Sequence, residues 1–192
     1  MYVKATRDDF VSRSMEALLQ MQRAHIREVF EVRRALSMHS VVLACVGATE
    51  KDIDGMESAL HRIDRATDAQ GVADAIADYQ IAFSAAGGNA LLTALESVLI
   101  RILLQIQLMA YGTRRDDWWR TYASELSNHR VRLLEGLRKR DVDAVLSAWR
   151  GYMDAQHTRF ETDPVLSQIT LDDRDAIDAV GDIAINVSPR LS

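Results

Sequence analysis

Cysteine, proline and glycine are scarce in this sequence of 192 residues. It contains one Cys, two Pro and nine Gly, so an internal disulfide is excluded and few positions interrupt a helix. The single cysteine, Cys45, lies in the apolar stretch SVVLACVGA, which favours a buried small side chain over a nucleophile or a metal ligand. With 48% hydrophobic residues, these shortages predict one all-α domain, an antiparallel bundle of about six or seven helices.

Basic residues are also fewer than acidic residues. The chain has 23 Lys and Arg against 28 Asp and Glu, a formal net charge of -5. In the stretches RTYASELSNHRVR and LRKRD the basic residues are mixed with carboxylates at helical spacing, which is typical of a solvated helix face. We therefore expect no nucleic-acid contact from these residues.

Signal-peptide and membrane-span features are lacking as well. The opening MYVKATRDDF is charged where a signal peptide would be apolar. The most apolar window, residues 90–112, carries Glu96, Arg101, Gln105 and Gln107, which would be costly in lipid. We expect it to be the central helix of a cytoplasmic protein without membrane contact.

Apolar periodicity and capping residues predict where the helices lie. The expected starts are marked by Thr49 in TEKD, by Asn89 and by Asp141, and the expected ends by Gly47, Gly87 and Pro164. The expected helices span 8–21, 26–47, 49–65, 73–86, 90–112, 118–140 and 142–161.

Motifs of known catalytic chemistry are missing. There is no phosphate-binding glycine loop, nucleophile elbow or HExxH helix, and no His has a second His or Cys three or four residues away. We expect neither an enzyme nor a cofactor. The alternative is a helical enzyme that uses Asp74, Asp78 or Glu96, although no His or Cys is placed to assist them.

Several polar residues lie where the pattern is apolar. A guanidinium is rarely buried unless it is paired or faces a ligand, so Arg33 and Arg101 are candidate ligand-binding residues, with a protein carboxylate as the alternative partner. Asp78, Tyr79 and Gln80 lie in a helix that should be buried and are further candidate ligand-binding residues. For Asp78 and Tyr79 the alternative is that they face solvent or satisfy a neighbouring group.

Three ordered motifs resemble the effector domain of GntR-type bacterial transcription regulators, in the FadR subgroup. EVFEVRRALSMHSVVLACVGATEKDID is similar to E-V-R-x-x-L-E followed by small apolar residues and A-T-x-x-D. AAGGNALL is similar to A-x-G-N-P-L-L, and RLLEGLRKRDVDAVLSAWRGY to I-L-E-A-L-x-x-x-D-x-x-x-A. The resemblance covers about 26–160 and implies an FCD-type helical domain that binds a small metabolite and helps the protein to form a homodimer.

The resemblance also implies a division of the chain. Residues 1–7, with MYVK, resemble the end of the wing of a winged helix-turn-helix, 8–163 form the effector-binding and dimerisation domain, and 164–192 form a C-terminal extension, a short helix or loose tail. Operator DNA is expected to bind only through a domain outside this sequence. Helix 8–21 is expected to transmit effector binding to that domain.

Many members of this family hold a metal ion with one Asp and three His. Without gaps, those positions fall on Ile76, Gln80, Arg130 and Tyr152, which are poor ligands. A shifted alignment would offer Asp78 and His129, so a metal-dependent carboxylate sensor is the alternative within the family.

The residues that stand at the family's metal positions in the alignment without gaps predict an anion site in place of a metal site. Gln80, Arg130 and Tyr152, with Arg33, supply hydrogen-bond donors and positive charge. DYQI is also similar to a D-Y-N-I stretch of the fatty-acid regulator, whose effectors are acyl-CoA thioesters. The expected ligand is therefore an organic acid or a fatty acyl-CoA. Its expected apolar walls are Leu99, Ile102, Leu103 and Ile106.

Overall fold

The computed structural model describes residues 24–111 and 116–169. They form helices α2 (Ile26–Gly47), α3 (Glu50–Arg65), α4 (Ala69–Ala85), α5 (Ala90–Tyr111), α6 (Asp116–Glu125), α7 (Ser127–Lys139) and α8 (Val142–Thr162), followed by one 3-10 turn, Leu166–Gln168. The all-α prediction is confirmed. The expected helix 8–21, the wing-like residues 1–7 and most of the extension 164–192 lie outside the described residues.

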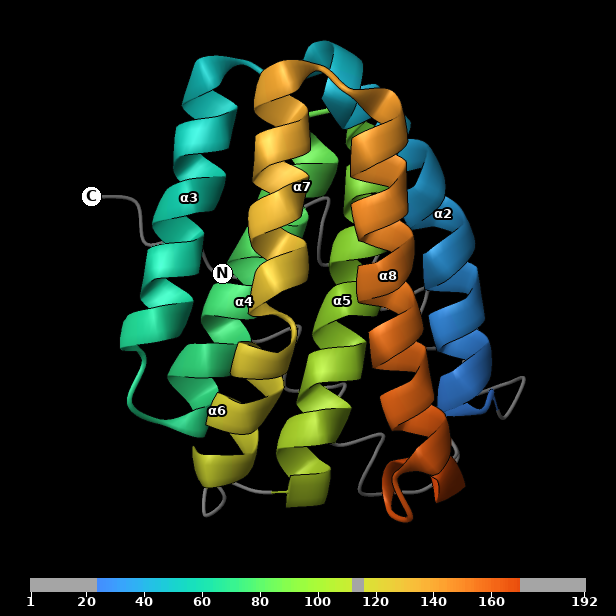
Figure 1. The fold of residues 1–192 in the computed structure, drawn as a ribbon. Coiled ribbons are helices and arrows are strands. Elements are labelled where there is room, and N and C mark those ends of the chain that lie inside the picture. The colour runs from blue at the N-terminus through green and yellow to red at the C-terminus, as the bar shows by residue number, and fades with distance from the viewer. Residues whose placement is uncertain (1–23, 112–115, 170–192) are drawn as a thin grey trace, which may run out of the picture.

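The helices pack as an antiparallel bundle. α4 packs against α3 and α5, while α8 packs against α2 and α7, and α2 contacts both α4 and α5. Figure 1 shows α3 on one flank of the bundle and α2 on the opposite flank. Contact between α3 and α7 joins the two groups on the α3 side.

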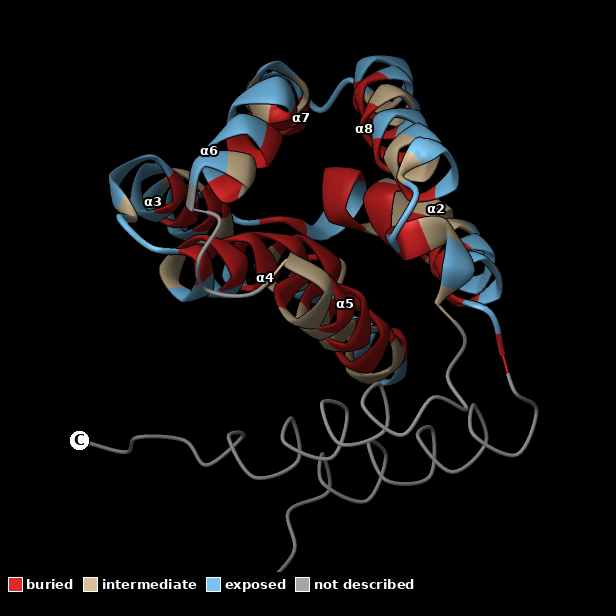
Figure 2. Ribbon diagram, turned by 90° about the horizontal axis from the view of Figure 1, so that it is seen from below, coloured by how far each residue is buried: buried red, intermediate tan, exposed pale blue. Residues whose placement is uncertain are grey.

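The bundle interior receives one face of each helix. Figure 2 shows the buried residues on the sides of α2, α4, α7 and α8 that turn toward the middle. By length and composition α5 could cross a membrane, but 61% of its most apolar window is buried inside the protein. A mostly buried core helix meets the same criteria of length and composition.

Side-chain caps begin three helices at the predicted residues. The Thr49 hydroxyl accepts the Asp52 amide at 3.2 Å, and the Asp52 carboxylate accepts the Thr49 amide at 2.8 Å. Asn89 and Asp141 each accept the backbone amide three residues later, at 3.1 and 2.9 Å. These bonds satisfy amides that have no partner inside their own helix.

Two predicted helix boundaries are wrong. α4 begins at Ala69 and not at 73, because the Asp68 carboxylate accepts the Gly71 amide at 2.7 Å and caps the helix earlier. The single helix expected over 118–140 is divided into α6 and α7. Leu126 separates them with φ -93° and ψ -4°, still in the right-handed helical region, and neither proline nor glycine marks the break.

Glycine permits the close approach of the α4–α5 turn to α2. A Cβ on Gly87 would lie 2.7 Å from the Leu43 Cβ, closer than carbon atoms pack. Gly88 has φ +73°, which glycine adopts without strain. The predicted helix stop is therefore also a packing contact.

Candidate functional site

Arg33 of α2 is a buried cation, with 2% of its surface exposed. Its Nη2 donates to the Gln80 side-chain oxygen at 2.7 Å, and its Nη1 donates to the Gln156 side-chain oxygen at 3.1 Å. Burial lowers the pKa of Arg33, and nearby Tyr152 and Glu96 oppose that change. The groups that accept these hydrogen bonds are neutral amides.

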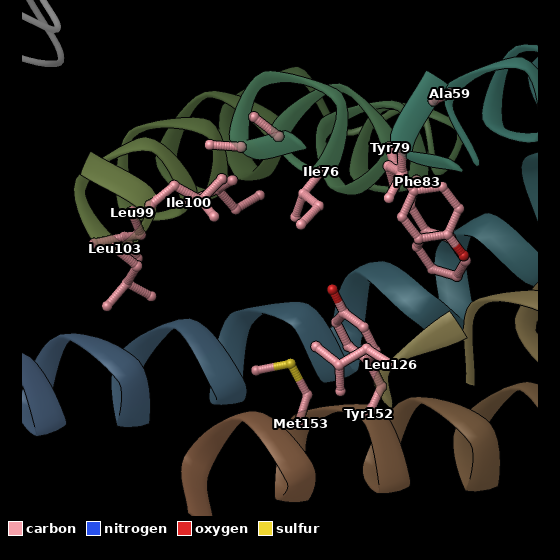
Figure 3. Packing of buried hydrophobic residues seen from close by; sticks show 14 of the residues in the cluster. Ala59, Ile76, Tyr79, Phe83, Leu99, Ile100, Leu103, Leu126, Tyr152 and Met153 are labelled. Carbon is pink, nitrogen blue, oxygen red and sulfur yellow. The ribbon is translucent and has the colours of Figure 1, made fainter. Parts of the chain in front are cut away.

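Two tyrosines extend this network across the bundle. The Gln80 amide nitrogen donates to the Tyr152 hydroxyl at 2.7 Å, and the Gln156 amide nitrogen donates to the Tyr122 hydroxyl at 2.7 Å. Figure 3 shows the Tyr152 hydroxyl pointing from α8 toward the α4 side of the interior. Burial raises the pKa of Tyr122, so it stays protonated. Each phenol oxygen accepts in these bonds, and its own proton can therefore be donated to a ligand.

Arg130 of α7 is the second buried cation, also 2% exposed. Its Nη1 donates to the Ala123 carbonyl at 2.9 Å, and its guanidinium carbon lies 5.7 Å from the centre of the Tyr152 ring. Its Nε and Nη2 have no hydrogen-bond partner among the described residues. These two nitrogens form one edge of the guanidinium, the fork that binds both oxygens of a carboxylate.

Tyr79 contributes to the position of Arg130. Its hydroxyl donates to the Arg130 backbone carbonyl at 3.3 Å, which ties α4 to α7. Burial raises the pKa of Tyr79, so the hydroxyl keeps the proton that it donates. The predicted residues Arg33, Tyr79, Gln80, Arg130 and Tyr152 thus occur together in the interior.

Two hollows adjoin the buried cations. A void of about 10 Å³ is lined by Arg33, Gln80, Gln156 and Leu103, and it has room for one water molecule. A larger hollow of about 190 Å³ lies between α3 and α7 and has Arg130 in its wall. We call it the α3–α7 groove. Of the four expected apolar walls, Leu103 lines the small void, while Leu99, Ile102 and Ile106 are packed in the core.

Two predicted site residues are placed elsewhere. Asp78 is exposed on α4 and forms an ion pair with Arg62 of α3 at 2.8 Å. Arg101 is partly exposed on α5, although the residues around it in the sequence are apolar. Neither side chain enters the hydrogen-bonded network of the buried cations.

The alternative metal ligands do not converge. Asp78 faces α3 through its ion pair, whereas the His129 ring packs against Gly151 of α8. In the described part of the chain, no group of three or more His, Cys, Asp or Glu residues could hold a metal ion.

The carboxylates suggested for an enzyme are also separated. Asp74 is exposed and accepts a hydrogen bond from Gln70. Glu96 is buried on α5 and accepts hydrogen bonds from Ser40 and Ser84. This serine–glutamate cluster was not predicted from the sequence.

Gln156 and Tyr122 are network members that the sequence analysis missed. Gln156 lies four residues after Tyr152 and so on the same face of α8. That spacing is the signal that could have identified it. No comparable spacing identifies Tyr122. The sequence predicts one continuous helix through this residue and Leu126, whereas the structure divides it into α6 and α7.

The FCD domain family matches residues 28–155, two thirds of the chain. The chain belongs to this family. As an FCD domain it is a ligand-sensing domain. The fold is similar to that of E. coli McbR/YncC, with a TM-score of 0.58 and 16% sequence identity. The similarity covers 68% of this chain and 65% of that chain. A comparison with curated protein sequences gives no significant match.

Proposed function

We propose that this FCD domain senses a small organic anion, which Arg33 and Arg130 attract into the bundle. One observation supports the proposal above the others: both guanidinium groups are buried, and every hydrogen-bond acceptor that the described residues offer them is neutral. Burial of an ion costs several kcal/mol unless charge and hydrogen bonds compensate for it. An anionic ligand would supply both.

Glu96 does not replace such a ligand. Its carboxylate is attracted to Arg33, but its hydrogen bonds come from Ser40 and Ser84. One buried carboxylate also leaves a second buried cation, Arg130, uncompensated. The charge of the interior therefore favours a further negative group.

Ligand binding at these residues would be coupled to the arrangement of the helices. The network joins α2, α4, α6, α7 and α8. An anion that accepts hydrogen bonds from these residues would therefore change contacts between helices that are distant in sequence. A ligand needs to favour one arrangement by only about 1–3 kcal/mol to act as a switch. In a cytoplasmic homodimer this difference would reach operator DNA through a winged-helix domain.

The size of the hollows favours a short organic acid. A cavity of about 150 Å³ holds a molecule as large as benzene, and the α3–α7 groove has about 190 Å³. A fatty acyl-CoA is the larger alternative, and it would require the helices to separate. This preference refines the ligand class that the sequence predicts.

A thermal-shift screen tests the proposal. Short monocarboxylates, dicarboxylates, sugar acids and acyl-CoAs are added in buffer with a chelator, and zinc and nickel are added in a separate series without it. We expect at least one organic acid to raise Tm in the chelated buffer, since a ligand at 100 times its Kd adds about 2.7 kcal/mol of stability. Stabilisation by a metal but by no organic acid would contradict the proposal.

A further inference from the structure

The α3–α7 groove carries charges of opposite sign at different depths. Arg130 is buried in its wall, whereas Asp64 of α3 and Glu135 of α7 are exposed at its rim. Glu57 and Arg138 also line the groove, but they bind each other at 2.7 Å and leave no net charge.

The rest of the polar lining includes two carboxylates, two unbonded nitrogens of one guanidinium and the imidazole of His61. Asp64 and Glu135 have no ion-pair or hydrogen-bond partner among the described residues. Arg130 has no partner for Nε or Nη2. Leu60 and Leu134 add apolar surface to the lining of the same groove.

We propose that the groove binds a short molecule with a carboxylate at one end and an ammonium group at the other, such as an amino acid. The carboxylate pairs with the Nε and Nη2 edge of Arg130, and the ammonium group donates to Asp64 and Glu135. This assignment rests on the proposed function and narrows its ligand class. A plain acid of equal length would satisfy Arg130 alone, and a dianion would be repelled at the rim.

Binding at Arg130 includes a local movement. The two free nitrogens are screened from solvent, so the side chains that cover them must move aside before a carboxylate in the groove reaches them. The ligand then favours the opened arrangement, which gives occupancy a structural consequence between α3 and α7.

Calorimetric titration with matched ligands tests this inference. The amino acids are γ-aminobutyrate, δ-aminovalerate and ε-aminocaproate, and the controls are butyrate, valerate and caproate. We expect one amino acid to bind about tenfold more tightly than the plain acid of equal length, as two exposed ion pairs permit. Equal affinities within every pair would overturn the inference.

Surface variants then locate the ammonium group. The double variant Asp64→Asn and Glu135→Gln should abolish the advantage of the amino acid and leave binding of the plain acid unchanged. A control that removes two exposed carboxylates outside the groove, Asp54→Asn with Asp143→Asn, should keep the advantage. An advantage that persists in the groove variant would also overturn the inference.

An arginine variant tests the other end. Arg130→Lys keeps the charge but lacks the two-donor fork, so it should weaken amino acids and plain acids alike. If plain acids bind the wild type without any preference for amino acids, the proposed function stands and the groove assignment fails. If neither series binds and no acid of the earlier screen stabilises the protein, both fail.

Discussion

Replacement of Arg33 by methionine separates a role in ligand binding from a role in stability. Methionine is unbranched and similar in length, so it fills the space of the arginine stem. It removes the charge and both amide hydrogen bonds, to Gln80 and Gln156. If Arg33 serves mainly to attract an anion, the empty protein should tolerate this change.

The opposing contributions are similar in size. Two hydrogen bonds from a charged donor contribute about 1.5–3 kcal/mol each, so their loss costs about 3–6 kcal/mol. Against this, the variant no longer buries an ion, a penalty of several kcal/mol. We therefore expect the free energy of unfolding to change by less than about 2 kcal/mol in either direction, or at most about 8 °C in Tm for a domain of this size.

A second variant provides the contrast. Gln80→Met keeps the buried charge but removes the acceptor of Arg33 and the donor to Tyr152, and it should destabilise the protein by about 3 kcal/mol. Combining it with Arg33→Met should recover most of that loss, because the unpaired charge is gone. Urea unfolding followed by far-UV circular dichroism measures all three proteins. A loss above about 4 kcal/mol for Arg33→Met, with a milder effect of Gln80→Met, would refute the reasoning and assign Arg33 a structural role.

Three further substitutions test contacts elsewhere in the bundle. Gly87→Ala should cost about 1–3 kcal/mol, because its Cβ would lie 2.7 Å from that of Leu43. Gly55→Ala is the matched control: nothing lies within 4 Å of its Cβ, so thermal unfolding should show a gain of about 0.5–1 kcal/mol. Arg140→Ala removes two side-chain hydrogen bonds to carbonyls at the end of α2 and should lower the free energy of unfolding by about 2 kcal/mol; an unchanged Tm would contradict that role.

The sequence predicts the helices where their ends are marked chemically. Thr49, Asn89 and Asp141 are strong N-cap residues, and all three cap the helices expected of them. Asp68 is an equally good cap, but Gly71 three residues later suggests a loop, so the sequence predicts a later start of α4 than the structure has. The break at Leu126 carries no chemical mark, because its backbone stays nearly helical.

The interior site was predictable in part for a related reason. Arg33 and Gln80 are polar residues in apolar helical patterns, and such exceptions can be read from one helix at a time. Arg130 and Tyr152 follow only from the resemblance to the family's metal positions. Asp78 lies two residues before Gln80 but points outward, since helical residues two positions apart are about 200° apart around the axis. Which polar groups meet depends on the packing of different helices, and the pairing of Arg33 with Gln156, 123 residues away, could not be derived from local pattern.

The structure of a complex with the most stabilising organic acid tests the central claim most directly. We predict the ligand carboxylate at the free edge of Arg130, with its two oxygens about 2.7–2.9 Å from Nε and Nη2. A ligand bound away from both buried arginines, or a divalent cation in the centre of the bundle, would contradict it.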